Sequence, residues 1–465
     1  MIPRLLLAAP HKSSGKTTVT LGLCAALAQH GLRIQPFKKG PDYIDPMWLG
    51  AAAGRPCYSL DPYVQQEEEI VREFSRHAAG CDLALIEGNM GLFDSLDVEG
   101  HHSNATLAAL LRAPVVLVVD VRGATRSIVP LLLGFQQFDP RIRIAGVILN
   151  KVAGKRHEQR LREAIGHYLE IPVIGAIHRD EAMVIDERHL GLIPSNEAQA
   201  AAALLTTIRN KVAAQVDLEA LRAIAQSAPP LPASDSTSPT AAKPADVRIG
   251  IARDAAFGFY YPEDLARLRR AGAELVPFDT LTGKGLPAVD GLLLGGGFPE
   301  TQMEALERNV AMREAIRAAI EDGMPCYAEC GGMMYLSRSI RWNDRCHEMV
   351  GIIPGETVMH SRPIGRGYVH LRPNGSAPWS SGDSPAFPAH EFHYSTLENL
   401  PEQTHFAYEV VRGAGIDGRH DGYVYKNLLA NYAHLRDVDG TPWCERFVGF
   451  VRKIAAQRQN RHAAQ

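Results

Sequence analysis

The chain of 465 residues has 46% hydrophobic and 22% charged residues, the composition of a globular protein of two or three domains. Its formal net charge of −3 gives no reason to expect nucleic acid or an acidic membrane surface as a partner. No basic segment followed by a long apolar run opens the chain, and it has no run of about 18 apolar residues, so we expect a cytoplasmic protein. The 7 cysteines form no Cys-x-x-Cys pair, which argues against a disulfide framework and a structural zinc site.

A phosphate-binding pattern stands near the start of the chain. An apolar run at residues 5–8 precedes Ser-Ser-Gly-Lys-Thr-Thr at 13–18, and a helix-forming run at 19–30 follows. This order is that of a P-loop, in which backbone N–H groups surround nucleotide phosphates, Lys16 reaches the β- and γ-phosphates and the Thr17 hydroxyl binds Mg²⁺. The alternative is a helix cap beside a solvated lysine. The expected ATP-binding residues of the loop are Ser13, Ser14, Gly15, Lys16, Thr17 and Thr18.

Acidic residues follow the next predicted strands. One strand runs into a loop at residues 38–46 that contains Asp45, and a buried strand ends at Glu87, seven residues before Asp94. Open α/β sheets bind ligands at the carboxyl ends of their strands, so we expect Glu87 to bind Mg²⁺ or its water. The alternatives are a solvated turn at 38–46 and a turn or capping role for Asp94.

Further predicted strands lie at residues 115–120, 144–149 and 172–177, and they alternate with helical segments. This alternation predicts a mostly parallel, doubly wound α/β sheet. Asn150 and Lys151 follow the second of these strands, so their polar side chains are candidates for reading the base of a bound nucleotide.

The composition changes after a helical segment at about residues 196–226. Residues 227–246 are rich in proline and serine and show no apolar periodicity, which is typical of a flexible linker. We therefore expect an N-terminal domain at 1–226 and a second domain at 247–450. A polar tail at 451–465 would follow, with fraying expected at 457–465.

Two glycine-containing motifs follow predicted strands of the second half. Gly296 and Gly297 come after an apolar strand, and their backbone N–H groups could form an oxyanion hole; a flexible turn is the alternative. Cys330 ends another strand, two glycines follow it and a helix begins, which is the pattern of a nucleophile elbow with cysteine in place of serine. The helix N-terminus would activate the thiol. Cys326 lies inside the strand and is expected to be inert.

A cysteine nucleophile needs a base, and several downstream histidines qualify. Residues 390–394 form a dense polar run with two histidines, and His434 lies in a short apolar run near the C-terminus. Spacing alone does not choose among the candidates, which are His360, His370, His390, His393, His420 and His434.

Six motifs can be followed along the chain, at residues 13–18, 39–45, 87–94, 296–300, 327–332 and 390–395. In this order they resemble the motifs of the cobyrinate a,c-diamide synthase family, and the resemblance covers nearly the whole length. It implies an N-terminal P-loop domain of the dethiobiotin-synthetase and MinD type. It also implies a C-terminal class I glutamine amidotransferase domain with a flavodoxin-like fold.

The resemblance implies a ligase of cobalamin biosynthesis that uses ATP, Mg²⁺ and glutamine. ATP would phosphorylate a carboxylate of a tetrapyrrole acid, and ammonia released from glutamine would displace the phosphate to form an amide. Cys330 maps to the family's nucleophile and His434 to its activating histidine, while Asp45 and Asp94 would orient the macrocycle. Ordinary class I amidotransferases carry a glutamate two residues after that histidine. Here Arg436 takes this place, so we expect a Cys–His dyad.

The motifs leave the macrocycle open. Cobyrinate is the expected substrate, and hydrogenobyrinate, nickel-sirohydrochlorin and sirohaem are alternatives on the same scaffold. The expected partners are these small molecules, and a homodimer is one option for the assembly. The rival interpretation is a non-enzymatic P-loop regulator with a degenerate amidotransferase domain, and the intact Cys330 and His434 count against it.

Overall fold

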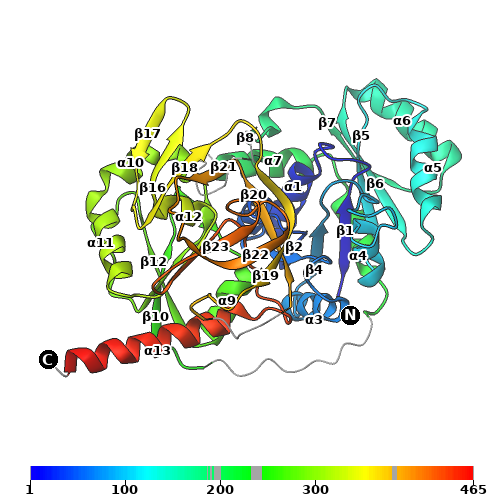
Figure 1. The fold of residues 1–465 in the computed structure, drawn as a ribbon. Coiled ribbons are helices and arrows are strands. Elements are labelled where there is room, and N and C mark those ends of the chain that lie inside the picture. The colour runs from blue at the N-terminus through cyan, green and yellow to red at the C-terminus, as the bar shows by residue number, and fades with distance from the viewer. Residues whose placement is uncertain are drawn as a thin grey trace. The chain divides into compact units, whose positions relative to one another are not determined.

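A computed structural model describes residues 2–185, 187–188, 191–192, 201–231, 243–379 and 385–463. The chain folds into two compact units, Met1–Ser238 and Pro239–Gln465, each built on a sheet with helices, so the expected α/β class is confirmed (Figure 1). Of the expected linker at 227–246, residues 232–242 lie outside the described part. The described start of this segment is bound to the N-terminal unit, because Arg4 and Arg112 donate hydrogen bonds to the carbonyl oxygens of Pro229 and Pro230.

The N-terminal unit is built on a seven-stranded parallel sheet with the order β3-β2-β4-β1-β5-β6-β7. Its strands are near-continuous apolar runs, such as Val-Val-Leu-Val-Val in β5, because helices cover both faces of a parallel sheet. The strands are β1 (Arg4–Ala8), β2 (Ile34–Lys39), β3 (Tyr58–Leu60), β4 (Leu83–Glu87), β5 (Val115–Asp120), β6 (Ile144–Val152) and β7 (Val173–His178).

The helices of this unit follow the strands in alternation, as predicted. They are α1 (Lys16–Gln29), α2 (Ile44–Ala53), α3 (Glu67–Ala78), α4 (Asn104–Leu110), α5 (Ile128–Phe138), α6 (Lys155–Tyr168), α7 (Ala201–Ala213) and α8 (Leu218–Gln226). A 3₁₀ turn η1 (Glu181–Met183) and the pair β8 (Glu187–Arg188) and β9 (Gly191–Leu192) complete the unit.

The single helical segment expected at 196–226 is wrong in one respect, because it is divided into α7 and α8. Residues 196–200 lie outside the described part. Between the two helices, Val216 forms an antiparallel bridge with Gly175 beside the sheet. The Asp217 carboxylate then accepts the backbone N–H of Ala220 at 2.9 Å. This N-cap satisfies a free helix donor and starts the second helix.

The C-terminal unit is built on a nine-stranded mixed sheet. Five parallel strands have the order β12-β10-β13-β15-β24, which is the flavodoxin-like 2-1-3-4-5 arrangement. An antiparallel extension, β23-β22-β19-β20, continues the sheet beyond β24. The parallel strands are β10 (Val247–Ala252), β12 (Ala273–Phe278), β13 (Gly291–Leu294), β15 (Cys326–Glu329) and β24 (Leu428–Asn431). The extension contains β19 (Gly365–Pro373), β20 (Phe387–His393), β22 (His405–Arg412) and β23 (His420–Tyr425).

Smaller sheets and helices surround this framework. One sheet of four strands contains β16 (Ser337–Trp342), β17 (Arg345–Glu348), β18 (Ile353–Met359) and β21 (Ser395–Glu398), and β11 (Phe257–Phe259) pairs with β14 (Gly296–Gly297). The helices are α9 (Pro262–Arg270), α10 (Met303–Arg308), α11 (Val310–Glu321), α12 (Gly331–Leu336) and α13 (Trp443–Ala463), with a 3₁₀ turn η2 (Pro299–Thr301). None of the helices in the described ranges has the length and apolar character that a bilayer crossing requires.

The expected tail at 451–465, with fraying from 457, is wrong as far as Ala463, because these residues are helical. Helix α13 starts before position 450 and continues through Ala463, and Figure 1 shows it as one long helix. Phe447, Val448 and Val451 are fully buried in the core of the C-terminal unit. The first part of the expected tail therefore belongs to a packed amphipathic helix, whose buried residues are spaced for one face.

We predict that Gly22→Ala destabilises the N-terminal unit by about 1–3 kcal/mol, because a core without free volume does not accept an added methyl group. A Cβ atom at Gly22 of α1 would lie 2.4 Å from Val212 Cγ2 of α7. The matched control is Gly134→Ala in α5, where a Cβ meets nothing within 4 Å and should raise helix stability slightly. Urea unfolding of both variants measures the difference. Equal stability of Gly22→Ala and the wild type would contradict the close packing of α1 on α7.

Candidate functional site

The P-loop lies between the end of β1 and the first turn of α1, as predicted. Gly15 has a φ of 81° and Ser13 a φ of 63°, both in the left-handed region. A Cβ at Gly15 would lie 2.3 Å from Asn150 Nδ2, so this position needs glycine for both its backbone and its space. Asn150 Nδ2 donates to the Ser14 carbonyl and Lys151 Nζ to the Ser13 carbonyl, each at 2.8 Å. The two residues expected to read the base therefore also hold the loop.

Side chains from four elements meet beside this loop. Thr17 Oγ1 donates to Glu87 Oε1 at 2.8 Å and lies 3.2 Å from Asp45 Oδ2. Lys38 Nζ lies 2.7 Å from the same Glu87 oxygen and 2.5 Å from the same Asp45 oxygen. Lys16 Nζ lies 3.9 Å from Glu87 Oε1. The strand register explains the meeting, because Glu87 on β4 pairs with Lys38 on β2.

Lys38 is a site residue that the motif analysis did not single out. Its side chain is only 2% exposed. Burial would lower its pKa, but the carboxylates of Asp45 and Glu87 raise the pKa of Lys38 well above its ordinary value. Burial and the Lys38 charge together lower the pKa of Lys16. The sequence did contain a signal for this role, since Lys38 stands near the end of a buried strand. A buried ammonium needs an anion beside it.

The oxygen atoms of this cluster fit Mg²⁺. This cation prefers hard oxygen ligands and is commonly held by one or two carboxylates together with substrate phosphates. Glu87 is fully buried, and its Oε2 has no hydrogen-bond partner among the described residues. An orphaned carboxylate oxygen beside the P-loop threonine suits a metal ligand. Asp45, which we expected to orient the macrocycle, contacts Thr17 and lies on the same side as Glu87.

A cavity of about 1070 Å³ opens beside the P-loop. Ligand pockets in proteins measure about 300–1,000 Å³, so a nucleotide fits in this space. Residues 11–18 line it together with Asp45, Asn150 and Lys151. The predicted ATP-binding residues are thus brought to one cavity, and Asp45 connects it to the carboxylate cluster.

The loop after β4 lies against the start of the P-loop and carries Asp94. The Leu92 N–H donates to the Ala9 carbonyl at 2.8 Å, and a Cβ at Gly91 would lie 2.6 Å from the Pro10 carbonyl oxygen. Asp94 is exposed, and its Oδ2 accepts the Gly91 N–H at 2.8 Å. The capping contact that stood as the alternative is therefore present, and it holds an exposed carboxylate near the P-loop.

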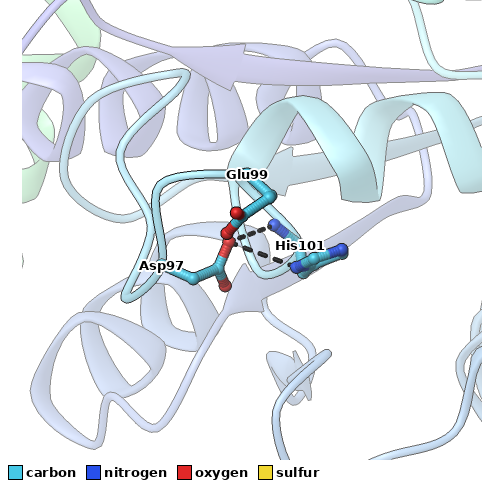
Figure 2. Close-up of side chains that lie close together, drawn as sticks. All are labelled: Asp97, Glu99 and His101. Carbon is cyan, nitrogen blue, oxygen red and sulfur yellow. Dashed lines mark hydrogen bonds and ion pairs between the residues drawn. The ribbon is translucent and has the colours of Figure 1, made fainter.

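Another acidic group lies farther along the same loop. Figure 2 shows Asp97, Glu99 and His101, whose ligand-type atoms lie within 4.8 Å of one another. The Asp97 carboxylate accepts the N–H of Gly100 at 2.7 Å and that of His101 at 3.1 Å, and it lies 3.2 Å from the His101 ring. These contacts explain why the three side chains lie close together, because they stabilise a turn at the surface.

Cys330 lies in the C-terminal unit at the sharp turn between β15 and α12. Its φ of 46° and ψ of −106° are unusual for a residue with a side chain. A Cβ at Gly332 would lie 2.1 Å from the Leu294 carbonyl oxygen, and one at Gly331 would lie 2.9 Å from the Gly297 nitrogen. The two glycines allow the strained turn to pack against neighbouring strand ends, as a nucleophile elbow requires.

His434 is the histidine that the structure brings to Cys330. It is 3% exposed and follows the end of β24 by three residues. Burial would lower its pKa, but hydrogen bonds to Cys330 and Glu329 raise the pKa of His434 to about 10. A protonated imidazole at neutral pH suits a cysteine nucleophile. A Cβ at Gly296 would lie 2.7 Å from His434 Cε1, so the expected oxyanion-hole glycines, Gly296 and Gly297, line this same site.

The polar run at residues 390–395 supports the site from β20. The His434 N–H donates to the His390 carbonyl at 2.7 Å, which forms a bridge between the two segments. The His393 ring stacks on Tyr432 with ring centroids 3.9 Å apart. These contacts position the segment that carries His434.

The structure corrects the expected Cys–His dyad, because a carboxylate does face the histidine. Glu329 Oε2 lies 3.2 Å from His434 Nδ1. Arg436, at the place of the usual acid, lies 3.4 Å from Glu263 Oε1. Sequence reasoning missed Glu329 because it directly precedes the nucleophile and stands 105 positions before the histidine that it contacts.

Known proteins match both units. The model of the CobQ/CobB/MinD/ParA nucleotide binding domain matches residues 5–192, and that of the CobB/CobQ-like glutamine amidotransferase domain matches residues 248–437. The chain is 48% identical to a cobyrinate a,c-diamide synthase of Magnetococcus marinus, over 97% of this chain and 98% of that protein. The chain belongs to the cobyrinate a,c-diamide synthase family.

Further relatives carry the same name and match over a similar share of the chain. Cobyrinate a,c-diamide synthases of Methanosarcina acetivorans and Archaeoglobus fulgidus are 40% and 38% identical to the chain, over 99% and 96% of its length and 97% of each of theirs. The resemblance seen in the motifs and the two domain types are therefore confirmed.

We predict that Lys16→Ala stops amidation with either glutamine or free ammonia as nitrogen source. In a P-loop this lysine contacts the transferring phosphate, and the loss of one such charge contact lowers a rate by about 10²–10³-fold. Product formation from each nitrogen source, with saturating ATP, measures the effect. Thr106→Ser, at the start of α4, serves as a control for general damage. Normal ammonia-dependent amidation by Lys16→Ala would contradict the role of the P-loop.

Proposed function

We propose that this member of the family amidates the a- and c-acetate side chains of cobyrinate, using ATP and glutamine, as a step of cobalamin biosynthesis. The observation that carries the proposal is the buried Cys330–His434 pair in a chain that also holds a P-loop with a carboxylate cluster. The shared name of its relatives over nearly their full length supports the substrate. An enzyme that takes ATP and glutamine from the cell would act in the cytoplasm.

The N-terminal site would activate the carboxylate. A carboxylate oxygen of the macrocycle attacks the γ-phosphorus of ATP, ADP leaves, and an acyl phosphate forms. Lys16 and the backbone of the P-loop bind the phosphates, and Thr17 and Glu87, with Asp45, would hold Mg²⁺, which neutralises charge on the phosphates. Lys38 holds the two carboxylates close together, and, against the effect of burial, its charge lowers the pKa of Asp45.

The C-terminal site would supply the ammonia. The sulfur of Cys330 attacks the carboxamide carbon of glutamine, and His434 gives a proton to the departing ammonia. Water then hydrolyses the thioester to glutamate and restores the cysteine. Gly296 and Gly297 lie where their backbone could stabilise the oxyanion. Ammonia attacks the acyl phosphate carbonyl, and inorganic phosphate leaves as the amide forms.

The test is an amidation assay with purified full-length protein, ATP, Mg²⁺ and glutamine. Cobyrinate, hydrogenobyrinate, nickel-sirohydrochlorin and sirohaem are compared as acceptors, and products are identified by mass spectrometry. The proposal expects the highest kcat/KM with cobyrinate and a diamide as the final product. A higher kcat/KM with another macrocycle would replace the substrate, and no glutamine- or ATP-dependent product with any acceptor would reject the proposed reaction.

We predict that Cys330→Ala abolishes glutamine-dependent amidation and keeps amidation with free ammonia. The substitution removes the nucleophile of the glutaminase site, whereas the carboxylate is still activated in the other unit. The control is Cys326→Ala, four residues earlier, because the Cys326 thiol is buried in β15 and burial raises its pKa. Glutamine use by Cys330→Ala at the wild-type rate would show that another residue is the nucleophile.

We predict that Glu87→Gln and Asp45→Asn slow amidation of both carboxylates equally, whereas Asp94→Asn changes the ratio of monoamide to diamide. The first two residues contact Thr17 on the metal side, and Asp94 is exposed on the loop beside the P-loop. Loss of a metal-side carboxylate affects every phosphoryl transfer. Time courses by mass spectrometry distinguish the effects. An unchanged product ratio in Asp94→Asn would end its assignment to the macrocycle.

A further inference from the structure

The side of His434 that faces away from the nucleophile contacts one carboxylate. Glu329 Oε2 lies 3.2 Å from His434 Nδ1. Since the Nδ1 atom is engaged there, Nε2 is the ring nitrogen that remains for the hydrogen bond to Cys330. A carboxylate on one imidazole nitrogen and a nucleophile on the other is the arrangement that defines the tautomer and the orientation of a catalytic histidine.

Glu329 is itself held in place by groups other than His434. Its Oε1 accepts the backbone N–H of Leu435 at 2.9 Å and a hydrogen bond from the Tyr327 hydroxyl. Asn431 Nδ2 in turn donates to the Tyr327 oxygen at 3.2 Å. The carboxylate is 8% exposed, so these contacts lie in a medium where electrostatic interactions are strong. These contacts therefore hold Glu329 in position independently of His434.

The other buried carboxylates near this segment are engaged elsewhere. Glu391 accepts the N–H groups of Ala414 and Gly415 at 2.7 and 2.9 Å. Asp421 accepts the N–H groups of Tyr432 and Ala433 at 3.0 and 2.9 Å. Both carboxylates thus hold backbone segments. Neither takes the place of Glu329 at the imidazole.

Among the other titratable groups near the pair, the buried Arg436 lies 3.4 Å from Glu263 Oε1, so these two opposite charges compensate each other. On β20, burial and the charge of His434 lower the pKa of His390 to about 3, so this ring is neutral. On α9, burial and Asp437 raise the pKa of Asp264 well above its ordinary value. Burial likewise raises the pKa of the nearby tyrosines Tyr260, Tyr327, Tyr408 and Tyr432.

We propose that Glu329, the residue directly before the nucleophile, is the positioning carboxylate of the glutaminase site and takes the part of the acid that usually follows the histidine. The inference rests on the proposed glutamine-dependent function. Glu329 holds the imidazole with Nε2 toward Cys330 and stabilises the imidazolium. The proton passes from His434 Nε2 to the departing ammonia and returns from the attacking water, so no step transfers a proton to Glu329.

The decisive variant is Glu329→Gln. Glu329 accepts hydrogen bonds at both oxygens, from Leu435 N–H and from His434 Nδ1–H, whereas glutamine has only one oxygen acceptor. The amide NH₂ would face one of the two donors, and the imidazole would lose its orientation. We expect kcat for glutamine hydrolysis to fall by about 10²–10⁴-fold. KM for glutamine should change far less, because Glu329 acts through His434.

The pH profile provides a readout that a merely structural role would not move. Glu329 is one of the two partners that raise the pKa of His434, so its loss lowers the pH at which the imidazolium loses its proton. In Glu329→Gln, the alkaline limb of kcat/KM for glutamine should move down by about 1 to 3 pH units. An unmoved limb with kcat within about twofold of the wild type would overturn the proposal.

The matched control is Glu391→Gln, which also neutralises a buried carboxylate in the same unit. Glu391 lies 3.7 Å from His393 and holds the loop at residues 413–415. We expect this variant to lose stability in urea and to keep the alkaline limb where it is in the wild type. A shift of the limb in Glu391→Gln as large as that in Glu329→Gln would overturn the assignment to Glu329.

Wild-type protein provides a measurement that does not depend on the folding of a variant. In protein labelled with ¹⁵N-histidine, a strongly hydrogen-bonded Nδ1–H of His434 should give a proton signal far downfield of the amides. The His434→Ala variant identifies the signal by its loss. Absence of this signal in folded wild-type protein would overturn the proposal. If Cys330→Ala retains glutaminase activity, the proposed function fails; if only Glu329→Gln retains it, the present inference fails alone.

Discussion

Both sites depend on one geometric constraint, that neighbouring parallel strands end at the same edge of a sheet. In the N-terminal unit, β1, β2 and β4 are adjacent, and their ends bring together the P-loop, Lys38 and Glu87. In the C-terminal unit, β15 pairs with β24, so Glu329 lies beside Asn431 and the Cys330 N–H reaches the Asn431 carbonyl at 2.7 Å. Loops at such an edge converge, which is why open α/β sheets bind ligands there.

Each site also contains a buried basic side chain that lies between two partner groups. Lys38 lies between Asp45 and Glu87, and His434 lies between Glu329 and Cys330. Removing a charged group from water is unfavourable by several kcal/mol unless an opposite charge and hydrogen bonds compensate. A buried pair of this kind is weak support for stability, but it holds side chains in defined positions. This preorganisation suits phosphoryl transfer and thiol chemistry, which need charge at fixed positions.

The glycines and the nucleophile could be assigned from sequence because each carries a local backbone signature. Gly15 and Cys330 both have positive φ, and their neighbours identify the P-loop and the elbow without any long-range contact. The strand and helix pattern was equally local. The division at Asp217 and the end of α13 were missed, because an N-cap and the burial of one helix face depend on which neighbours are present.

By itself the sequence determined the two α/β units, the P-loop, the cysteine elbow and the family to which the chain belongs. Only the tertiary structure decided that Lys38 and Glu329 act with them. Six histidines were equivalent by spacing and the family resemblance pointed to His434, and the structure gives the physical reason, because β24 ends beside β15. The contact of Glu329 with His434 and that of Lys38 with Glu87 could not be predicted from sequence. The residues are 105 and 49 positions apart, and such contacts depend on strand register. Register is set by the packing of the whole sheet, and no local pattern contains it.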